Sequence, residues 1–270
     1  MGRSDEDQLR PTSCPGYGSL TGTLSFRRQR GEVMKATDWN RTNLPPLGLL
    51  WRYGGWWRWL ILALILVGAG ATAWHPVLGL ALLGSAACLA WFFRNPPRVV
   101  APDPLSVISP VDGVVDDLAI TDGSPWMQGE ALHIGIFLSV LDVHATRAPV
   151  TGTVRERLAT PGTHRNAMSP RVGATNQRNE IWLSDVAGRS LLLRQIAGAV
   201  ARRVIFAPQP GDTVHAGAVV GMIRFGSRAE LWLPMRSGYV ATVWHGEKVR
   251  SGTSVLARIP DVSQPQAKHR

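Results

Sequence analysis

Three short motifs of the sequence carry side chains that can cooperate in nucleophilic catalysis. SPVDG contains the carboxylate of Asp112, FLSVLDVH ends with the imidazole of His144, and RFGSR contains the hydroxyl of Ser227. A hydroxyl is a weak nucleophile until a base takes its proton, and the base works best when a third group fixes its tautomer. The motifs therefore predict an Asp–His–Ser set, provided that the fold brings three distant segments together.

The same motifs resemble those of one enzyme family. FLSVLDVHATRAP (residues 137–149) is similar to a segment of phosphatidylserine decarboxylases in which LDVH or DYH is followed by Arg-Ala-Pro or its equivalent. GMIRFGSRAELWLP (221–234) looks like the self-cleavage segment of the short family members. QIAGAVARRVI (195–205) and FFRNPPR (92–98) also fit the family pattern. The resemblance covers about residues 56–259 and indicates a proenzyme of the short bacterial and archaeal type.

The resemblance implies a self-processing, pyruvoyl-dependent carboxy-lyase. Ser227 would attack the carbonyl of Gly226, the chain would part between these two residues, and Ser227 would become a covalent pyruvoyl cofactor. Glycine suits position 226 because the lack of a Cβ admits the nucleophile. Through a Schiff base with the pyruvoyl group, the enzyme would convert phosphatidylserine to phosphatidylethanolamine and carbon dioxide. The large and small chains would stay together as a heterodimer, and a further oligomer is left open.

His144 is predicted to be the base for self-cleavage and a candidate proton donor in decarboxylation, with Asp112 orienting its ring. Long family members carry a second histidine where this sequence has Arg147, whose guanidinium holds its protons too tightly to act as an acid. The proton transfers that two histidines share in those members are therefore expected to fall on His144 alone. The alternatives are that His144 is an ordinary histidine at a strand end and that Asp142 only fixes a turn. The remaining histidines lack metal-ligand spacing, so no metal site is predicted.

Residues 99–260 are predicted to form the catalytic domain, because short runs rich in Val, Ile and Leu alternate with Gly, Pro and Asp, as in strands and turns. Two elements recur within it. GDTVHAG at 211–217 has a counterpart in GEKVRSG at 246–252, and the pattern Pro-x-x-Gly-x-Val begins at Pro110 and again at Pro149. Such glycine-bounded turns resemble those of lipoyl and biotinyl domains. The expected fold is therefore mostly β and barrel-sandwich-like.

Two uncharged apolar runs, 60–74 and 77–93, precede this domain and predict a membrane helical hairpin over residues 56–93. Each run is close to the minimum of about 17 residues that a helix needs to cross a bilayer core of roughly 30 Å. Tryptophans cluster at the ends of the runs, and arginines stand before and after the pair, which favours a cytoplasmic location for both ends. The alternative is a pair of buried core helices in a soluble domain.

The two ends of the chain differ from the segments between them. Residues 1–50 are polar and lack a helical or strand period, which indicates a disordered segment, and Met34 is an alternative start of translation. Residues 261–270 form a polar tail. Cys14 and Cys88 lie in a polar and an apolar segment, so no disulfide between them is expected.

The formal net charge of +10 favours an anionic partner, either nucleic acid or a membrane surface. The aromatic residues gather around the apolar runs instead of alternating with basic residues, so nucleic acid is not an expected partner. The predicted location is the cell membrane, with the catalytic domain on the cytoplasmic side. The alternative function is a membrane-anchored adaptor or carrier of the lipoyl or biotinyl type, although Lys248 lacks the Met-Lys context of a modified lysine. A zinc peptidase of the lysostaphin type is disfavoured because a His-x-His pair is missing.

Overall fold

The computed structural model describes residues 43–45, 47–101, 103–122, 127, 129–163, 175–198, 204–224 and 227–260. Nearly all of the polar segment predicted over residues 1–50 lies outside these ranges, as do Met34, Gly226 and the predicted tail at 261–270. The described chain begins with three helices, α1 (Gly48–Tyr53), α2 (Trp57–Ala71) and α3 (Pro76–Phe92). The strands follow after α3.

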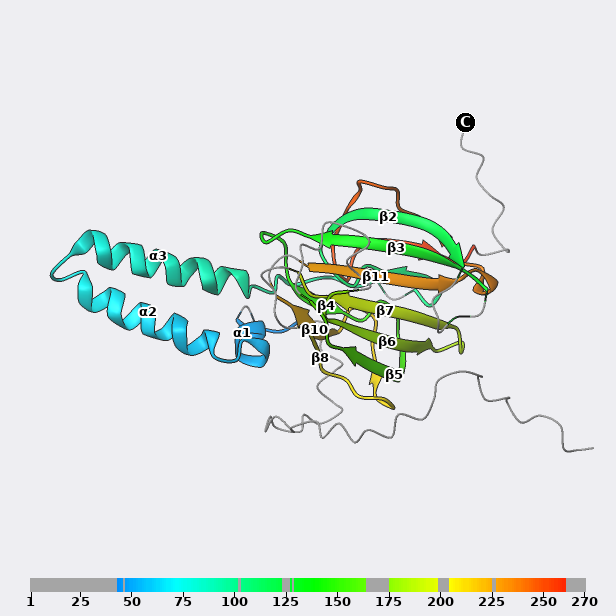
Figure 1. The fold of residues 1–270 in the computed structure, drawn as a ribbon, viewed down its shortest axis with the longest axis horizontal. Coiled ribbons are helices and arrows are strands. Elements are labelled where there is room, and N and C mark those ends of the chain that lie inside the picture. Colours follow the sequence, from blue (N-terminus) through cyan, green and yellow to red (C-terminus); the bar gives the residue numbers. More distant parts are fainter. Residues whose placement is uncertain are drawn as a thin grey trace, which may run out of the picture. The chain divides into compact units, whose positions relative to one another are not determined.

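Helices α2 and α3 lie within the segment predicted to form a hairpin (Figure 1). Pro76 occupies the first turn of α3, where its missing N–H costs no hydrogen bond. The helices approach closely where Gly68 faces Gly79, because a Cβ built on Gly79 would lie 2.8 Å from the Gly68 carbonyl oxygen. In the part of the chain that the structure describes, no helix is long and apolar enough to cross a membrane.

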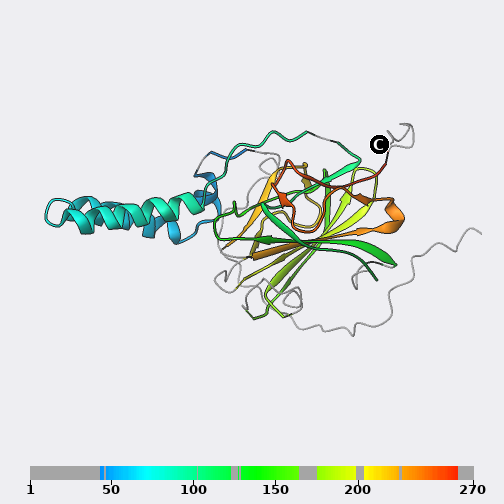
Figure 2. The same cartoon turned by 90° about the horizontal axis from the view of Figure 1, so that it is seen from above.

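The rest of the described chain is mostly β, as predicted. The strands are β1 (Ser106–Ile108), β2 (Gly113–Asp122), β3 (Glu130–Leu138), β4 (Ala145–Arg147), β5 (Gly152–Thr160), β6 (Arg178–Asp185), β7 (Ser190–Ile196), β8 (Val204–Phe206), β9 (Thr213–Val214), β10 (Val219–Ile223), β11 (Ser227–Pro234), β12 (Val240–Ala241), β13 (Lys248–Val249) and β14 (Val255–Arg258). An eight-stranded sheet has the order β13-β2-β3-β11-β7-β6-β5-β9, and two small sheets have the orders β1-β14-β12 and β4-β10-β8. Figure 2 shows the twist of the large sheet.

The strand order reveals an internal duplication of the β domain. The large sheet reads alike from both edges toward the centre, where β11 meets β7, and the two small sheets have equivalent partners. Gly113 pairs with Val249 in one copy, and Gly152 pairs with Val214 in the other. The glycines that bound the two recurring turns, at 211, 217, 246 and 252, all have positive φ. The recurrence in the sequence is therefore a structural repeat, and its glycines adopt a backbone conformation that other residues rarely take.

The second copy is inserted into the first. Strands β4 to β10 form the second copy without interruption, whereas the first copy consists of β1 to β3 and then β11 to β14. In the second copy, the short connection 186–189 joins β6 directly to β7. In the first copy, the equivalent pair is β3 and β11, and residues 139–226 separate them. Ser227 is thus the residue at which the chain re-enters the first copy.

Candidate active site

The three motifs meet at one end of the large sheet. Strand β2 begins at Gly113, immediately after Asp112, and runs antiparallel to β3, which ends at Leu138. Leu138 pairs with Ser227, the first residue of β11. His144 lies a few residues beyond Leu138, and its carbonyl accepts a hydrogen bond from the N–H of Ile223 at 3.2 Å, close in the chain to Ser227. The fold therefore brings the three predicted site segments into one region.

Gly113 is required for this arrangement at the start of β2. A Cβ on Gly113 would lie 2.2 Å from the carbonyl oxygen of Phe137 in β3, a distance that no side chain tolerates. Gly152 occupies the same position in the second copy, where a Cβ would lie 2.2 Å from the carbonyl oxygen of Ser184. The glycine of the recurring Pro-x-x-Gly-x-Val pattern thus lets neighbouring strands approach closely and holds Asp112 at the end of the sheet.

Ser227 is fully buried, and its Oγ has no hydrogen-bond partner among the described residues. Burying a hydroxyl without a partner destabilises a fold by about 1–3 kcal/mol. Such groups in native structures often have a catalytic role. The hydroxyl predicted to be the nucleophile is therefore held in the core without a competing hydrogen bond from these neighbours.

His144 is fully buried and is held on two sides. Its Nδ1 lies 2.9 Å from the carbonyl oxygen of Asp142, and the ring of Phe92 lies against it with the ring centroids 4.4 Å apart. A carbonyl only accepts hydrogen bonds, so Nδ1 carries the proton and Nε2 carries the lone pair. Nε2 is buried and has no partner among the described residues. Burial lowers the pKa of His144 from 6.5 to about 4, so the ring is a neutral base at pH 7.

The orienting contact to His144 therefore comes from the backbone of Asp142, and no hydrogen bond joins His144 to Asp112 within the described chain. The carboxylate of Asp142 accepts a hydrogen bond from the N–H of Ser139 at 2.8 Å, which closes the turn between them. Asp142 thus has the turn-forming role that the sequence left as an alternative. The predicted orienting role of Asp112 stays a prediction.

Asp112 uses its two carboxylate oxygens differently. Oδ1 accepts a hydrogen bond from the N–H of Ser251 at 2.8 Å, and Oδ2 pairs with Nη2 of Arg98 at 2.7 Å. In the second copy, Thr151 stands at the equivalent position, and its Oγ1 accepts from the N–H of Ala216 at 3.0 Å. A hydroxyl is therefore enough to accept this backbone hydrogen bond. The second oxygen of Asp112 and its partner Arg98 distinguish the site from its repeat.

The FFRNPPR motif at residues 92–98 lies across this site. Phe92 contacts the His144 ring, Nη2 of Arg94 donates to the carbonyl of Leu141 at 2.5 Å, and Arg98 pairs with Asp112. Asn95 accepts a hydrogen bond at 2.9 Å from Nη2 of Arg147, which is fully buried. The sequence placed this motif in the family pattern but assigned its residues no role. That match was the only available signal, because the contacts join segments far apart in the chain.

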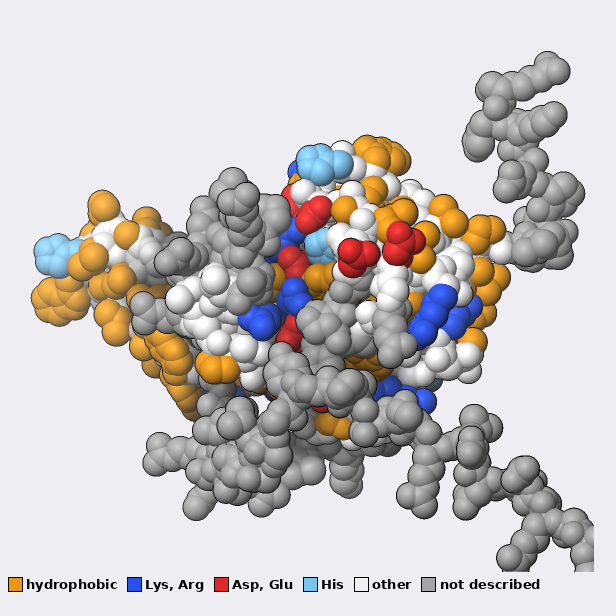
Figure 3. Space-filling view, turned by 45° about the vertical axis from the view of Figure 1, so that its right-hand side comes forward, with side chains coloured by type: hydrophobic (Ala, Val, Ile, Leu, Met, Phe, Trp, Pro, Cys, Tyr) orange, Lys and Arg blue, Asp and Glu red, His pale blue; other side chains and the backbone are white. Residues whose placement is uncertain are grey.

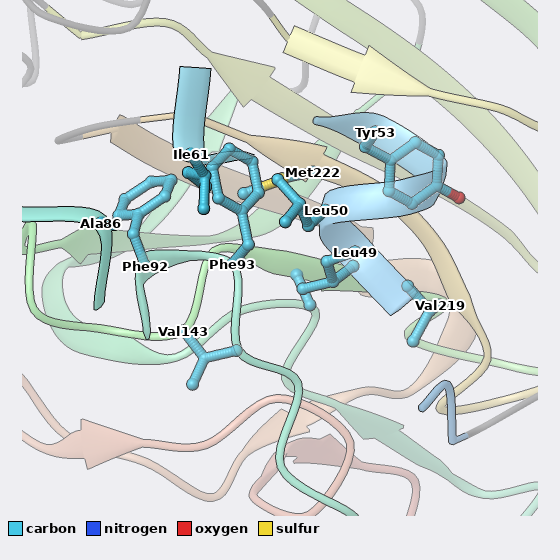
Figure 4. Packing of buried hydrophobic residues seen from close by; sticks show 11 residues of the cluster. Leu49, Leu50, Tyr53, Ile61, Ala86, Phe92, Phe93, Val143, Val219 and Met222 are labelled. Carbon is cyan, nitrogen blue, oxygen red and sulfur yellow. The ribbon is translucent and has the colours of Figure 1, made fainter. Parts of the chain in front are cut away.

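The base of the helical hairpin packs on the small sheet β4-β10-β8 next to the site (Figure 4). The buried cluster joins residues of the three helices to others from the loop before β4 and from β4 and β10: Leu49, Leu50, Tyr53, Ile61, Ala86, Phe92, Phe93, Val143, Ala145, Val219 and Met222. Nη2 of Arg224, which lies just before the predicted cleavage position, donates to the carbonyl of Tyr53. The hairpin is thus tied to the segments that carry both His144 and Ser227.

A network of charged side chains, with Arg228 and Glu230 buried, follows Ser227 along β11. Arg228 is fully buried, and its guanidinium contacts Asp116, Asp117 at 3.5 Å and Glu230 at 2.8 Å. A Cβ on Gly135 would lie 2.1 Å from Nη2 of Arg228, so glycine is needed to admit this side chain. Figure 3 shows acidic, basic and histidine side chains side by side on one face of the β domain. Because successive strand residues point to opposite faces, this network anchors β11 from the face opposite Ser227.

Within the described ranges, no group of three or more His, Cys, Asp or Glu side chains is placed to hold a metal ion. Among the predicted site residues, Oγ of Ser227 and Nε2 of His144 are buried and have no hydrogen-bond partner within the described chain. A hydroxyl and a neutral imidazole are the types of group that serve as a nucleophile and its general base.

Comparison with known proteins identifies the class of enzyme. A family model described as phosphatidylserine decarboxylase matches residues 85–257. The chain is 41% identical over 187 residues to a protein named phosphatidylserine decarboxylase proenzyme from Salinibacter ruber, covering 68% of this chain and 81% of that protein. It is 34% identical over 257 residues to a protein of the same name from Novosphingobium aromaticivorans, covering 90% and 95% of the two chains.

A third relative with this name, from Carboxydothermus hydrogenoformans, is 36% identical over 211 residues, which cover 78% of this chain and 97% of that protein. The matched region of the family model contains the C-terminal part of α3, all of β1 to β13 and each predicted site residue. The chain is an enzyme of the decarboxylase class. It belongs to the phosphatidylserine decarboxylase family.

Proposed function

We propose that this protein is a self-processing decarboxylase that acts on phosphatidylserine. The observation that carries the proposal is the buried, unpartnered hydroxyl of Ser227, at the end of the sheet where the Asp112 and His144 motifs also meet. The names of the relatives support both the proenzyme state and the substrate. The family match also removes the main support for an adaptor or carrier, since that alternative rested on the glycine turns alone.

In the proposed self-cleavage, Oγ of Ser227 attacks the carbonyl carbon of Gly226 while Nε2 of His144 takes the hydroxyl proton. The C–N bond between the two residues breaks, the serine nitrogen takes a proton, and an ester joins them. Loss of the Ser227 α-proton then expels the ester oxygen as the carboxylate of Gly226 and leaves a dehydroalanine. Addition of water and release of ammonia convert this residue to a pyruvoyl group. Each step uses only water and groups of the chain.

Asp112 is proposed to stabilise His144 when the ring takes this proton, because a carboxylate near an imidazolium favours the charged form. The internal repeat provides a matched variant that separates this role from folding. Asp112→Thr introduces the residue that the second copy uses for the same backbone hydrogen bond, and it removes the carboxylate. We expect Asp112→Thr and Asp112→Asn to fold and to cleave slowly. Normal cleavage in both variants would show that Asp112 acts only in the turn.

The residues at the site fit a pyruvoyl group, because its formation turns Cβ of Ser227 into a methyl group and so removes a buried hydroxyl that has no partner among the described residues. The group supplies an electrophilic carbonyl that binds the substrate amine and accepts the electron pair left by carbon dioxide. His144 lies in the same region and is the proposed source of the proton that replaces carbon dioxide. Its neutral state at pH 7 means that it must first take up a proton from the substrate amine or water.

The two chains formed by cleavage are proposed to stay associated. Strand β11 would belong to the small chain, and it pairs on one side with β3 and on the other with β7, both of the large chain. Arg228 adds ion pairs to Asp116 and Asp117 of β2. A strand with two backbone ladders leaves the sheet only at the cost of both. This arrangement, and the duplicated glycine turns of a barrel-sandwich-like domain, support a stable heterodimer of the large and small chains.

The helical hairpin is proposed to embed in the cytoplasmic face of the cell membrane. Its apolar side chains are widely exposed, including Leu66 at 64% and Trp74 at 84%, and Figure 3 shows hydrophobic side chains covering it. Between Asp38 and Asp103 the sequence contains arginines but no acidic residue. Exposed apolar area and positive charge together favour an anionic leaflet. This proposal requires insertion of the hairpin and does not require that either helix crosses the bilayer.

The test of the proposed function is turnover of phosphatidylserine by the purified protein in detergent micelles. We expect release of carbon dioxide in equal amount to phosphatidylethanolamine, and none from Ser227→Ala. Equal turnover by Ser227→Ala would contradict the role of Ser227. Turnover of a different amino-phospholipid, with phosphatidylserine left intact, would contradict the substrate.

A further inference from the structure

The turn that leads to His144 ends in two exposed apolar side chains. Val140 is 50% exposed and Leu141 is 69% exposed, although residues 139–142 form a tight turn of the kind in which Gly, Asn, Asp and Pro dominate. The turn is well held, because the N–H of Asp142 donates to the carbonyl of Ser139 at 3.1 Å and the Asp142 carboxylate binds the Ser139 N–H. Its apolar tip is thus a fixed feature of the surface.

This tip is joined to the base of the hairpin, at the C-terminal end of α3. Nη2 of Arg94 donates to the carbonyl of Leu141 at 2.5 Å, and the Arg94 guanidinium lies 3.6 Å from the centroid of the Trp91 ring. Trp91 is itself 48% exposed and belongs to the last turn of α3. Val140, Leu141, Trp91 and Arg94 therefore form one continuous surface, which we call the tip surface. It combines aliphatic, aromatic and cationic groups, as segments at a membrane interface do.

We propose that the tip surface inserts into the anionic leaflet beside the hairpin, so that the site around His144 and Ser227 opens at the membrane interface. This inference rests on the proposed function, because it takes the substrate to be a lipid of that leaflet. The tip surface is continuous with the exposed apolar surface of the hairpin. Apart from His75, the charged side chains of residues 43–101 are all arginines: Arg52, Arg58, Arg94 and Arg98. Positive charge of this kind complements an anionic leaflet and not a basic protein partner.

The tip surface is relevant to function because the turn that carries it is directly connected to His144. Asp142 closes the turn through its N–H and its carboxylate, and its carbonyl holds Nδ1 of His144. A lipid whose headgroup lies beside Leu141 would therefore reach the region of His144 without its acyl chains leaving the bilayer. Moving one exposed Val or Leu side chain from water into the membrane interface changes the membrane partition coefficient of the protein by about tenfold. We expect the Val140→Ser/Leu141→Ser variant to lose at least that factor in kcat/KM on vesicles, relative to a soluble short-chain phosphatidylserine.

The first test does not depend on activity. It uses the full chain with Ser227→Ala, Cys14→Ala and Cys88→Ala, and a nitroxide label on a single new cysteine: Leu141→Cys, Leu66→Cys in α2, or Val186→Cys. Val186 is 68% exposed in the turn between β6 and β7, at the other end of the large sheet, and is the matched control. Vesicles of phosphatidylcholine with phosphatidylserine are added, and accessibility to oxygen is compared with accessibility to a water-soluble nickel complex.

We expect a severalfold rise in the oxygen-to-nickel ratio at positions 141 and 66 and none at 186. If position 66 responds and position 141 behaves like 186, the tip surface is not a membrane contact and the inference is overturned. Spin–spin broadening at position 141 without vesicles would assign the surface to a second copy of the chain and would equally overturn it.

The second test compares turnover on vesicles with turnover on a soluble short-chain phosphatidylserine, with Val186→Ser as the control variant. A fall in this ratio for Val140→Ser/Leu141→Ser alone supports the inference. An unchanged ratio contradicts it. Failure of the unaltered protein to act on either lipid would instead contradict the proposed function, and the spin-label result would stand by itself.

Discussion

The pH dependence of self-cleavage tests the environment that the structure gives to His144. The ring is fully buried, and burial lowers its pKa from 6.5 to about 4. At pH 5 about nine-tenths of a group with a pKa near 4 is neutral, compared with about 3% of a histidine with the ordinary value. A buried base should therefore cleave the chain roughly thirty times faster at pH 5 than an exposed histidine would.

The assay follows proenzyme that is labelled in a brief cell-free translation and diluted into buffers from pH 8 to pH 4. Samples are stopped in detergent and the intact and cleaved chains are separated. We expect a rate that is nearly constant down to pH 5 and then falls with a midpoint near pH 4. A midpoint near pH 6.5 would refute the reasoning, because the base would then be exposed to water or would be another residue.

The same pKa predicts a change in stability, which provides a control for unfolding. The pKa of His144 is lower in the folded chain than in the unfolded chain, so the unfolded chain takes up the proton first as the pH falls. The contribution of His144 to the free energy of unfolding is therefore fully present above pH 6.5. About 3 kcal/mol of it is lost as the pH falls from 6.5 to 4. Urea unfolding of Ser227→Ala should show this loss, and the loss should be smaller by about the same 3 kcal/mol in Ser227→Ala with His144→Gln, where the buried His133 still titrates. An equal loss in both chains would contradict the assignment.

Three further predictions concern the surroundings of the site. Arg228→Met in the Ser227→Ala chain should lower the free energy of unfolding by about 1.5–3 kcal/mol, because the buried Glu230 carboxylate keeps only its ion pair with Arg194; a loss below 1 kcal/mol in urea unfolding would contradict this. Phe92→Ala should expose the His144 ring and move the midpoint of the cleavage profile toward pH 6.5, whereas an unmoved midpoint would show that Phe92 does not shield it. The full chain should stay with membranes in 1 M salt, because insertion of apolar helices is not screened by ions, and release by salt would indicate binding through arginines alone.

The β domain was predictable because its signals are local. Glycines at fixed spacing need positive φ or close approach, and the recurring motifs report both. The pairing of the two copies was not predictable in the same way. One copy is inserted between β3 and β11, so these two strands pair although residues 139–226 separate them in the chain. No local pattern encodes such a pairing.

The candidate site was predictable in its members and not in its contacts. The motifs identified Asp112, His144 and Ser227, and the fold brings their segments to one end of the sheet. The structure adds an orienting contact that the sequence did not predict, from the carbonyl of Asp142 to Nδ1 of His144, while the role of Asp112 stays a prediction. A backbone carbonyl has no signature in the sequence. The pairing of Arg98 with Asp112 was missed for a related reason, since only the fold places residue 98 beside the turn.

The most direct test of the central claim is the intact mass of the purified protein under denaturing conditions. Self-cleavage with conversion of Ser227 predicts two chains. One ends at Gly226, and the other comprises residues 227–270 and is lighter by one ammonia than a chain that begins with serine. A single mass for the uncut chain, or a small chain that retains its amino-terminal serine, would contradict the account.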